Sequence, residues 1–277
     1  MTLGFMEVVY SENSIRMGVL LAAGRGLRLY PLTRTKPKCL VQVNGKSILE
    51  RLISSLNACG IDRLIVVTGY KDTMIRDFLE HHRGGIAVSY VYNGLYETTN
   101  NIYSLYLARN MINAPFLLME SDIIFQPALL RKMTAPDRIA IADPAAWMNG
   151  TTVVMNRRNR VKAFQTNIPE STGPSVKKTV NMYSFSLPSW KQIEKQLKKE
   201  ISRGKVTDYY ETVFKTLVDK DRIALQGVSF DAGAWYEIDT VDDLAAAEKL
   251  FLRSADAART QSAPETMGIQ QVLHEEW

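Results

Sequence analysis

The sequence predicts an α/β fold in which helices flank a doubly wound sheet of mixed, mainly parallel strands. Short apolar runs with the length of buried strands alternate with segments whose apolar residues recur at helical spacing. Glycine or acidic residues follow several of these runs, and in such sheets ligands bind beyond the carboxyl ends of the strands. The 277 residues allow one or two domains. We expect one, because neither an internal repeat nor a second autonomous unit is visible.

The first apolar run, 19–23, leads into a loop that is rich in glycine and basic residues. Gly24 and Gly26 open this loop, and Arg28 and Lys38 follow. Glycine lets the backbone approach a ligand closely, and successive N–H groups form a concavity that holds anions. The loop therefore predicts a phosphate-binding site, with a triphosphate and its diphosphate leaving group as the expected anions. The spacing fits neither the G-x-G-x-x-G nor the Walker A pattern, and a tight turn with incidental basic residues is the structural alternative.

The next elements are predicted from cap and turn residues. We expect a strand over 39–43 and, after an Asn-Gly turn, a helix with Ser47 as its N-cap and Glu50 at the capping-box position. Gly60 is expected to end this helix. A buried strand at 64–68 follows, and this order of strand, helix and strand favours parallel packing.

Three polar positions are expected to line one crevice. Gly24, Gly69 and Asp122 each stand at or directly after the end of a predicted strand. Tyr70, beside Gly69, either approaches a bound base or packs in the protein. Asn100 is a candidate N-cap, with a contact to base or substrate as a second interpretation. The elements in this part of the chain are expected to be a helix at about 72–81, strands at 87–92 and 116–119, and a helix after Asn100.

The strand at 116–119 delivers Glu120, Ser121 and Asp122. Carboxylates at a strand end suit Mg²⁺, a hard cation that proteins bind with few carboxylates together with substrate phosphates. Taken alone, an aspartate in this place is more often a turn residue, but the glycine loop upstream favours a metal ligand. Asp239 is predicted to end a later strand at the same crevice, so the two aspartates are expected to share one Mg²⁺.

From about residue 138 the pattern is less regular. We expect the segment 138–190 to form a small β-rich insertion that builds one wall of the crevice. The helix that follows carries many lysines and is most simply an amphipathic helix with a solvated face. The elements expected here are strands at 139–141, 152–155, 161–164, 180–186, 223–228 and 235–240, and helices at 190–203, 208–217 and 241–251.

Bulk properties narrow the classes of function. Hydrophobic residues make up 46% of the chain, and the net charge of +5 fits an anionic substrate. An arginine-rich tract or a basic stripe with aromatics, which would favour nucleic acid, is missing. Two cysteines without a CxxC suit a reducing compartment. The first residues lack a signal-peptide pattern, and no run approaches about 18 apolar residues. We therefore expect a cytoplasmic protein without nucleic-acid or membrane partners.

Three strings together resemble the nucleotidyltransferases that join a nucleoside triphosphate to a phosphorylated small molecule. They are AAGRGLRLYPLTRTKPK at 22–38, NNIYSL at 100–105 and EIDTVDDL at 237–244. Within that superfamily the chain is most similar to the bacterial branch that uses CTP, which includes phosphocholine and 2-aminoethylphosphonate cytidylyltransferases. The resemblance implies a Rossmann-like fold of the nucleotide-diphospho-sugar transferase type in one domain at 17–253. Residues 1–16 would then be an N-terminal extension and 254–277 a C-terminal tail.

The resemblance also implies a reaction and assigns residues to it. An oxygen of the acceptor's phosphate or phosphonate attacks the α-phosphorus of CTP, and pyrophosphate leaves. Arg28 would bind the β- and γ-phosphates, Lys38 would stabilise charge near the α-phosphate, and Asp122 and Asp239 would hold the Mg²⁺ cofactor. Contacts to the nucleotide are expected from Ala22, Ala23, Gly24, Gly26, Tyr70, Asn100 and Ser121.

The acceptor pocket is the part that the sequence determines least. A quaternary ammonium such as choline needs a cage of aromatic rings, whereas a primary amine needs carboxylate or carbonyl oxygens. A lysine is also available to grip the acceptor's phosphate, although each aromatic ring is individually more typical of a core. The candidates for acceptor binding are Glu120, Trp147, Lys178, Tyr183, Trp235 and Glu237.

Two other functions stay open at this point. One is a sugar-1-phosphate nucleotidyltransferase that uses UTP, dTTP or GTP, although such enzymes often carry a C-terminal β-helix for which this chain has no room. The other is a regulatory module that binds a nucleotide without turnover, which the intact pair of basic residues and pair of aspartates disfavours. A homodimer is possible.

Overall fold

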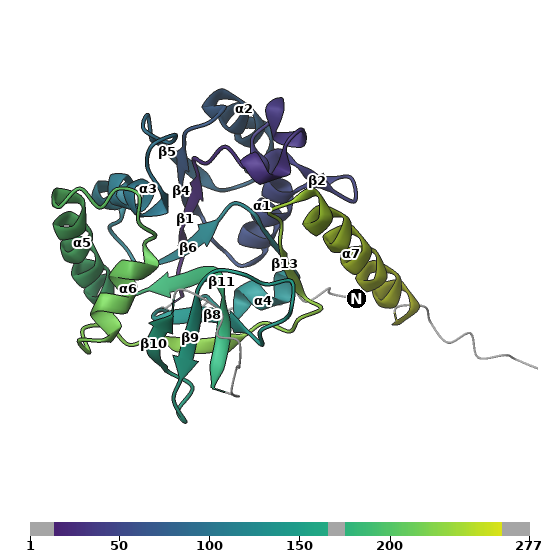
Figure 1. The fold of residues 1–277 in the computed structure, drawn as a ribbon. Coiled ribbons are helices and arrows are strands. Elements are labelled where there is room, and N and C mark those ends of the chain that lie inside the picture. Colours follow the sequence, from purple (N-terminus) through teal and green to yellow (C-terminus); the bar gives the residue numbers. More distant parts are fainter. Residues whose placement is uncertain (1–13, 166–174, 262–277) are drawn as a thin grey trace, which may run out of the picture.

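The computed structural model describes residues 14–165 and 175–261, and a nine-stranded mixed sheet forms its centre (Figure 1). One half of the sheet consists of parallel strands in the order β6-β1-β4-β5. They are β1 (Met17–Ala22), β4 (Arg63–Thr68), β5 (Ala87–Tyr92) and β6 (Phe116–Glu120). The predicted α/β fold is therefore confirmed, and the strand at 87–92 has the predicted bounds.

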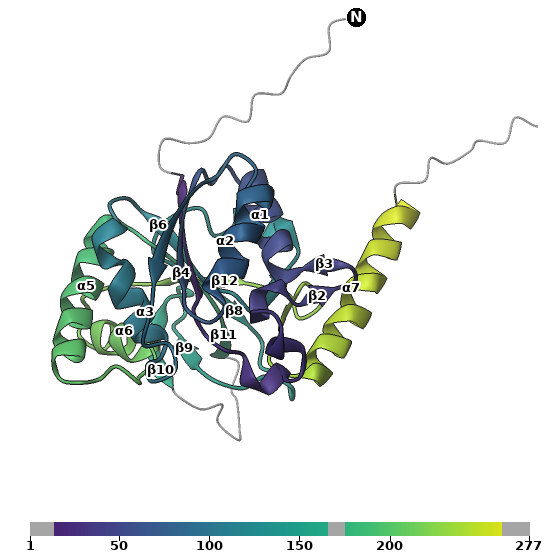
Figure 2. The same ribbon diagram turned by 90° about the horizontal axis from the view of Figure 1, so that it is seen from above.

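Helices cover both faces of this sheet (Figure 2). All six residues of β1 are buried, and successive side chains of a strand point to opposite faces. Leu20 packs on one face, while Val19 and Leu21 pack on the other. The first face carries α1 (Ile48–Ala58), α2 (Asp72–His82) and α4 (Pro127–Arg131), and the second carries α3 (Asn101–Ala108), α5 (Leu187–Ser202) and α6 (Glu211–Val218).

The predicted helix caps are confirmed. At the start of α1 the hydroxyl of Ser47 accepts a hydrogen bond from the backbone N–H of Glu50 at 3.1 Å. At the start of α3 the side chain of Asn100 accepts one from the N–H of Asn101 at 2.8 Å. Each cap satisfies an N–H group that has no partner within its own helix.

The stretch 39–43, predicted as a strand, is a strand only at its end. Lys38–Leu40 form a short 3₁₀ helix, η3, and β2 (Gln42–Val43) pairs with β3 (Lys46–Ser47). The two strands meet at the predicted Asn44-Gly45 turn, where both residues have positive φ. The prediction was too long because the backbone of η3 forms its hydrogen bonds within its own turn and has no neighbouring strand.

The other half of the sheet is built around the long strand β11 (Val176–Phe185), which runs antiparallel to β6, β8 and β9. The segment 138–190, which was expected as a small β-rich insertion, supplies β8, β9 and β11, and these strands extend the main sheet. Strand β12 begins at Gln226, three residues later than predicted. The remaining strands here are β8 (Arg138–Ala142), β9 (Thr152–Met155), β10 (Val161–Gln165) and β12 (Gln226–Ser229).

A small second sheet, which the sequence did not predict, joins two distant segments. Strand β7 (Ile123–Phe125) pairs antiparallel with β13 (Trp235–Glu237), and the N–H of Ile238 bonds the carbonyl of Asp122 at 2.9 Å. Asp239 was expected at the end of a strand, but it stands two residues beyond β13. It reaches the crevice because β7 carries β13 alongside the end of β6.

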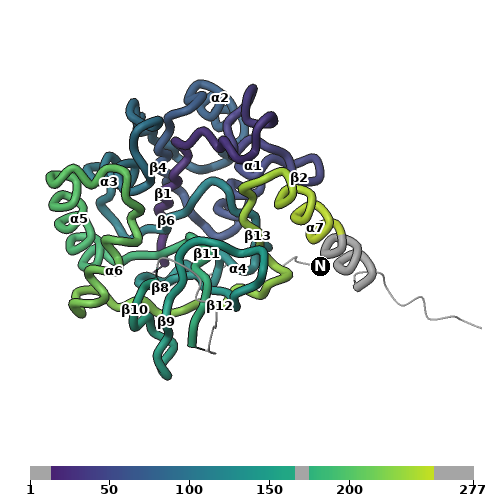
Figure 3. The backbone as a smooth tube through the Cα atoms, viewed as in Figure 1, coloured from purple at the N-terminus to yellow at the C-terminus, as the bar shows by residue number. Residues whose placement is uncertain are grey.

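The last described helix, α7 (Val241–Gln261), lies against the β2–β3 hairpin near the opposite end of the sequence (Figure 3). The side chain of Asn44 donates to the carbonyl of Glu248 at 2.9 Å. The helix was predicted to stop at 251, so the first part of the expected tail is helical. Residues 1–13, most of the expected N-terminal extension, and 262–277 lie outside the described residues. Within the described part, none of the helices is long and apolar enough to span a membrane.

Candidate active site

A cleft of about 450 Å³ opens at the carboxyl end of β1 and β6. The described residues that line this cleft come from the glycine loop, the start of α3, the segment after β6 and the loop before α7. Its position agrees with the rule that ligands of open α/β sheets bind beyond the carboxyl ends of the strands. Among the residues that the sequence singled out, the cleft is lined by Ala23, Gly24, Gly26, Arg28, Lys38, Asn100, Glu120, Ser121, Asp122 and Asp239.

The glycine loop is held in shape by hydrogen bonds to its own carbonyl groups. Gly26 has a φ of 63°, a left-handed conformation that a side chain disfavours. Its carbonyl accepts from the hydroxyl of Thr33 at 2.9 Å and from the N–H of Leu29 at 3.0 Å. Gly24 is exposed, and a side chain there would meet nothing within 4 Å, so its backbone is open to a ligand.

Tyr70 supports this loop from outside the cleft. Its hydroxyl donates to the carbonyl of Thr33 at 2.8 Å, and its N–H donates to the carbonyl of Ala23 at 3.0 Å. Of the two interpretations left open for Tyr70, the structure shows a packing role that braces the loop. Ala22, the last residue of β1, is buried behind the loop.

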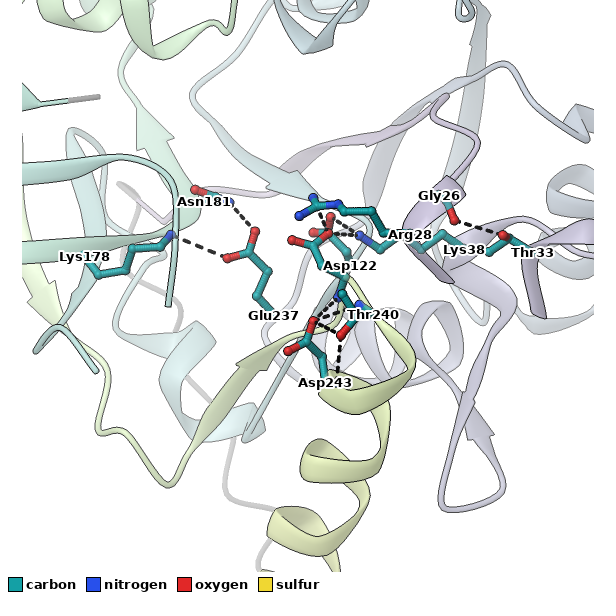
Figure 4. Close-up of polar contacts among 11 residues, drawn as sticks. Gly26, Arg28, Thr33, Lys38, Asp122, Lys178, Asn181, Glu237, Thr240 and Asp243 are labelled. Atoms are coloured by element: carbon teal, nitrogen blue, oxygen red, sulfur yellow. Dashed lines mark hydrogen bonds and ion pairs between the residues drawn. The ribbon is translucent and has the colours of Figure 1, made fainter. Parts of the chain in front are cut away.

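Two basic and two acidic side chains meet in the middle of the cleft (Figure 4). The Nζ of Lys38 lies 2.8 Å from Asp122 Oδ2 and 2.7 Å from Asp239 Oδ1. The Nη2 of Arg28 lies 2.9 Å from the same oxygen of Asp239. Burial lowers the pKa of Lys38, but the two carboxylates outweigh it, so its pKa is raised above the ordinary value and the ammonium stays charged. Residues 201 positions apart in the chain are thus brought into direct contact.

The two aspartates and Glu237 form a set of oxygen ligands that fits a divalent cation. One carboxylate oxygen from each of the three lies within 4.8 Å of the others. The Oδ1 of Asp122 is buried and has no hydrogen-bond partner, so it is available to an ion. Hard cations such as Mg²⁺ prefer carboxylate oxygens, and the donor set is consistent with that ion.

Asp239 is positioned by a capping box at the start of α7. The carboxylate of Asp243 accepts hydrogen bonds from the N–H groups of Asp239 and Thr240, at 3.1 and 2.8 Å, and the hydroxyl of Thr240 accepts one from the N–H of Asp243 at 3.1 Å. Asp243 was not among the predicted site residues. The signal was present, because a threonine followed three residues later by an acid is the capping-box pattern.

Behind Glu120 lies a group of buried polar side chains on the sheet and α6. Asn101 connects them: its Nδ2 donates to Glu120 Oε1 at 2.9 Å, and its Oδ1 accepts from the N–H of Tyr210 at 2.9 Å. The hydroxyl of Tyr183 lies 3.5 Å from an oxygen of Glu211. Burial is the main reason that the pKa values of Glu120 and Glu211 are raised, the latter to about 7.

Lys178 and Glu237 form a second, deeper ion pair. Only 1% of the Lys178 side chain is exposed, and its Nζ lies 3.5 Å from Glu237 Oε2. Asn181 donates to the other oxygen of Glu237 at 3.1 Å. Burial raises the pKa of Glu237 to about 7, although Lys178 opposes the change. The structure therefore places Lys178 outside the lining of the cleft. Glu211, Asn101 and Asn181 gave no signal of this arrangement, because each belongs to a different element.

The aromatic candidates for acceptor binding pack against other rings. Tyr183 and Trp235 are fully buried, and Tyr183 stacks on Phe185 with ring centroids 6.0 Å apart. Trp147 is half-buried and stacks on Tyr236 at 4.1 Å. None of these three rings lines the cleft, so the expectation that they form an acceptor pocket there is corrected.

Comparison with known proteins agrees with this geometry. A CMP-5'-(3-aminopropyl)phosphonate synthase of Streptomyces rubellomurinus is 27% identical over 254 residues, which are 84% of this chain and 38% of that protein. A choline-phosphate cytidylyltransferase of Streptococcus pneumoniae is 27% identical over 234 residues, 84% of this chain and 97% of that protein.

The fold has the same relatives. The solved structure of the CTP:phosphocholine cytidylyltransferase from Streptococcus pneumoniae superimposes with a TM-score of 0.74 at 25% identity, covering 86% of this chain and all of that one. Residues 17–253 match the model of the nucleotidyl transferase family. With its glycine loop, its cations and its paired aspartates in one cleft, the chain belongs to the nucleotidyl transferase family.

Proposed function

We propose that this protein transfers a cytidylyl group from CTP to a small acceptor with a phosphate or phosphonate group, such as phosphocholine or 2-aminoethylphosphonate, and releases pyrophosphate. The observation that carries the proposal is the convergence of Arg28, Lys38, Asp122 and Asp239 beside the glycine loop. The choice of CTP is supported by the relatives named above, two of which are described as cytidylyltransferases acting on phosphocholine.

The nucleotide would lie over the glycine loop. Polar contacts for the base, sugar and phosphates would come from the open backbone around Gly24. Further contacts would come from Ala23, Asn100 and Ser121, which line the cleft. Arg28, whose side chain is 62% exposed, can leave its ion pair with Asp239 and bind the β- and γ-phosphates. Its guanidinium presents a fork of donors that suits phosphate oxygens.

The chemistry is one in-line displacement. A new bond forms between an acceptor oxygen and the α-phosphorus of CTP as the bond to the β-phosphate oxygen breaks, and pyrophosphate departs with the electron pair. The acceptor oxygen is already an anion, so the protein does not need to remove a proton or supply a nucleophile. Its contribution is to position the two reactants and to neutralise charge, which Lys38 does at the α-phosphate.

Asp122 and Asp239 would hold the divalent cation that we propose as cofactor, with Glu237 within reach. When bound, Mg²⁺ would supply a Lewis acid and a template for phosphate oxygens. Asp243 and Thr240 keep the backbone of Asp239 in place for this role.

A panel of nucleotides and acceptors tests the proposal. Pyrophosphate release should be measured with CTP, UTP, dTTP, GTP and ATP, each with phosphocholine, phosphoethanolamine, 2-aminoethylphosphonate, inositol 1-phosphate and glucose 1-phosphate. We expect CTP to be preferred with an amino-alcohol phosphate or aminophosphonate. A preference for UTP, dTTP or GTP with glucose 1-phosphate would instead assign a sugar-1-phosphate nucleotidyltransferase, and binding without any turnover would indicate a regulatory module.

A further inference from the structure

We propose that the acceptor carries a primary ammonium group a few atoms from its phosphorus, and that the carboxylates of Glu120 and Glu211 bind this group. The inference rests on the proposed cytidylyl transfer and adds to it the chemical class of the acceptor. It chooses between an acceptor with a quaternary ammonium and one with a primary amine, which the sequence did not distinguish.

Glu211 carries the first observation. It begins α6, is 7% exposed, and has one carboxylate oxygen, Oε2, that is buried without a hydrogen-bond partner. Its other oxygen has only a long contact, 3.5 Å, with the hydroxyl of Tyr183. Burying an unpaired carboxylate oxygen is unfavourable because the water that it loses is not replaced. A ligand with N–H donors would replace that water.

Asn101 places Glu211 next to the cleft. The amide of Asn101 holds Glu120, which lines the cleft, on one side, and on the other it holds the backbone of Tyr210, the residue before Glu211. Glu211 itself does not line the cleft but lies behind Asn101, with one carboxylate oxygen 3.5 Å from the hydroxyl of Tyr183.

The balance of charge in the described part of the chain points to a cation. Asp122 and Asp239 pair with Lys38 and Arg28, and Glu237 pairs with Lys178. Among the described residues, neither Glu120 nor Glu211 has a basic side chain within ion-pair distance, and Lys178, whose charge also acts on Glu211, is paired with Glu237. A positively charged group of the acceptor would supply the missing partner.

The arrangement of the aromatic rings near the cleft favours a primary amine over a quaternary ammonium group. A quaternary ammonium has no N–H group and is bound by the faces of several aromatic rings. The rings of Tyr183 and Trp235 are buried, the ring of Trp147 stacks on Tyr236, and none of the three lines the cleft. Two tyrosines line the cleft: Tyr209, which is 59% exposed, and Tyr96, whose ring lies beside that of Tyr70 with centroids 6.2 Å apart. A primary ammonium donates three hydrogen bonds, which suits carboxylate oxygens.

The position of the acidic pair limits the length of the acceptor. Glu120 lies two residues before Asp122 at the same strand end, and both line the cleft. The phosphorus end of an acceptor must lie by Asp122 and Asp239 to be transferred. The ammonium group must therefore be separated from the phosphorus by a short chain, as in an aminoalkyl phosphate or phosphonate.

The test compares three acceptors that differ only at the nitrogen, with wild-type enzyme and saturating CTP. They are 2-aminoethylphosphonate, its N,N,N-trimethyl analogue and ethylphosphonate, which has no amine. We expect kcat/KM for the primary amine to exceed that of both others by about 10²-fold or more, because each of the others leaves buried carboxylate oxygens unpaired. Equal or faster use of the trimethyl analogue, or of ethylphosphonate, would overturn the inference while leaving cytidylyl transfer intact. Failure of CTP to react with any acceptor of the panel would overturn the proposed function itself.

A variant locates the binding group. Glu211→Gln should lower kcat/KM for the primary amine by roughly 10- to 100-fold, mainly through KM, and leave the KM for CTP unchanged. The preference of this variant for the primary amine over the trimethyl analogue should decrease by a similar factor. Glu80→Gln, which makes the same change at an exposed position of α2, should alter neither constant. A folded Glu211→Gln enzyme that keeps the full preference would remove Glu211 from the site, and the comparison of acceptors with wild-type enzyme does not depend on how this variant folds.

Discussion

The two ends of the cleft differ in how their charges are balanced. At the glycine-loop end, Asp122 and Asp239 lie within 2.9 Å of the nitrogens of Lys38 and Arg28, and the four charges cancel. At the other end, the half-buried Glu120 and the buried Glu211 have no basic side chain within ion-pair distance among the described residues, and burial raises their pKa values. The first end must rearrange its ion pairs to accept a metal and phosphates, whereas the second gains a partner when a cation binds.

The largest effect is expected at the balanced end. Asp122→Ala should abolish pyrophosphate release, a loss of at least about 10³-fold, because it removes a proposed metal ligand together with a partner of Lys38. Circular dichroism should show an intact fold, because Lys38 keeps its ion pair with Asp239 when the Asp122 carboxylate is removed. The measurement is the initial rate over a range of Mg²⁺ concentrations.

Asp219→Ala provides the control for that variant. Asp219 is an exposed aspartate at the end of α6 that pairs with Lys215 on the surface, and its loss should leave the rate and the Mg²⁺ dependence unchanged. Near-normal activity of Asp122→Ala would exclude Asp122 from the mechanism. It would also contradict the proposal that the balanced end of the cleft binds the metal.

The next effect concerns the cation between the aspartates. Lys38→Met should lower kcat by about 10²-fold, the usual cost of losing one donor that stabilises charge in the transition state. Lys46→Met, at an exposed position of β3, should have no effect. A rise in KM for CTP with an unchanged kcat would show instead that Lys38 binds the ground state.

The same variant should have the opposite effect on the metal. Because the ammonium of Lys38 sits on the oxygens that we assign to the cation, the ion has to displace it when it binds without nucleotide. Lys38→Met should therefore bind Mn²⁺ about tenfold more tightly in the absence of CTP, since a competing positive charge is gone. Electron paramagnetic resonance of free Mn²⁺ measures this directly. Weaker binding would mean that Lys38 orients the carboxylates for the ion.

The unbalanced end should make stability depend on pH. Burial raises the pKa of Glu211 from 4.5 to about 7, so between those values the folded chain keeps a proton that the unfolded chain releases. The free energy of unfolding should consequently be highest below about pH 4.5 and fall as the pH rises to about 7. The side chain of Glu211→Gln cannot titrate. The free energy of unfolding of this variant should therefore fall by about 1–3 kcal/mol less than that of the wild type over the same pH window. Urea unfolding at pH 5 and pH 7.5 measures the difference, and parallel losses in both proteins would contradict it.

The two ends also differ in how far the sequence predicted them. The glycine loop, Arg28, Lys38 and Asp122 were found because each stands in a local pattern next to a strand. Asp239 was expected at the same crevice because it stands at the end of a predicted strand, but its contact with Lys38 was not predicted. That contact depends on the pairing of β7 with β13, and β7 had no signal of its own.

The acidic end had no comparable pattern. Glu120, Asn101 and Glu211 belong to three elements, and only the packing of α6 on the sheet brings them together. The aromatic rings misled the prediction for a related reason. Composition shows that Tyr183, Trp235 and Trp147 are present, but whether a ring face is free depends on neighbours that are distant in the sequence.

The smallest effect is expected from the capping box of α7, and a second cap allows it to be isolated. Thr240→Val and Ser47→Ala each remove a side-chain oxygen that accepts from a helix N–H at 3.1 Å. Both should lower the free energy of unfolding by about 1 kcal/mol, which corresponds to a fall in Tm of about 2–4 °C for a chain of this size. On stability alone the two variants should look alike.

Only one of these caps lies next to the metal ligands. The Asp243 carboxylate that the hydroxyl of Thr240 contacts also holds the N–H of Asp239, whereas Ser47 caps α1 and does not line the cleft. Thr240→Val should therefore raise the Mg²⁺ concentration needed for half-maximal rate by a few fold, since Asp239 is less well fixed. Ser47→Ala should leave that concentration unchanged. Equal shifts in both variants would mean that metal binding at the balanced end follows overall stability and not the local position of Asp239.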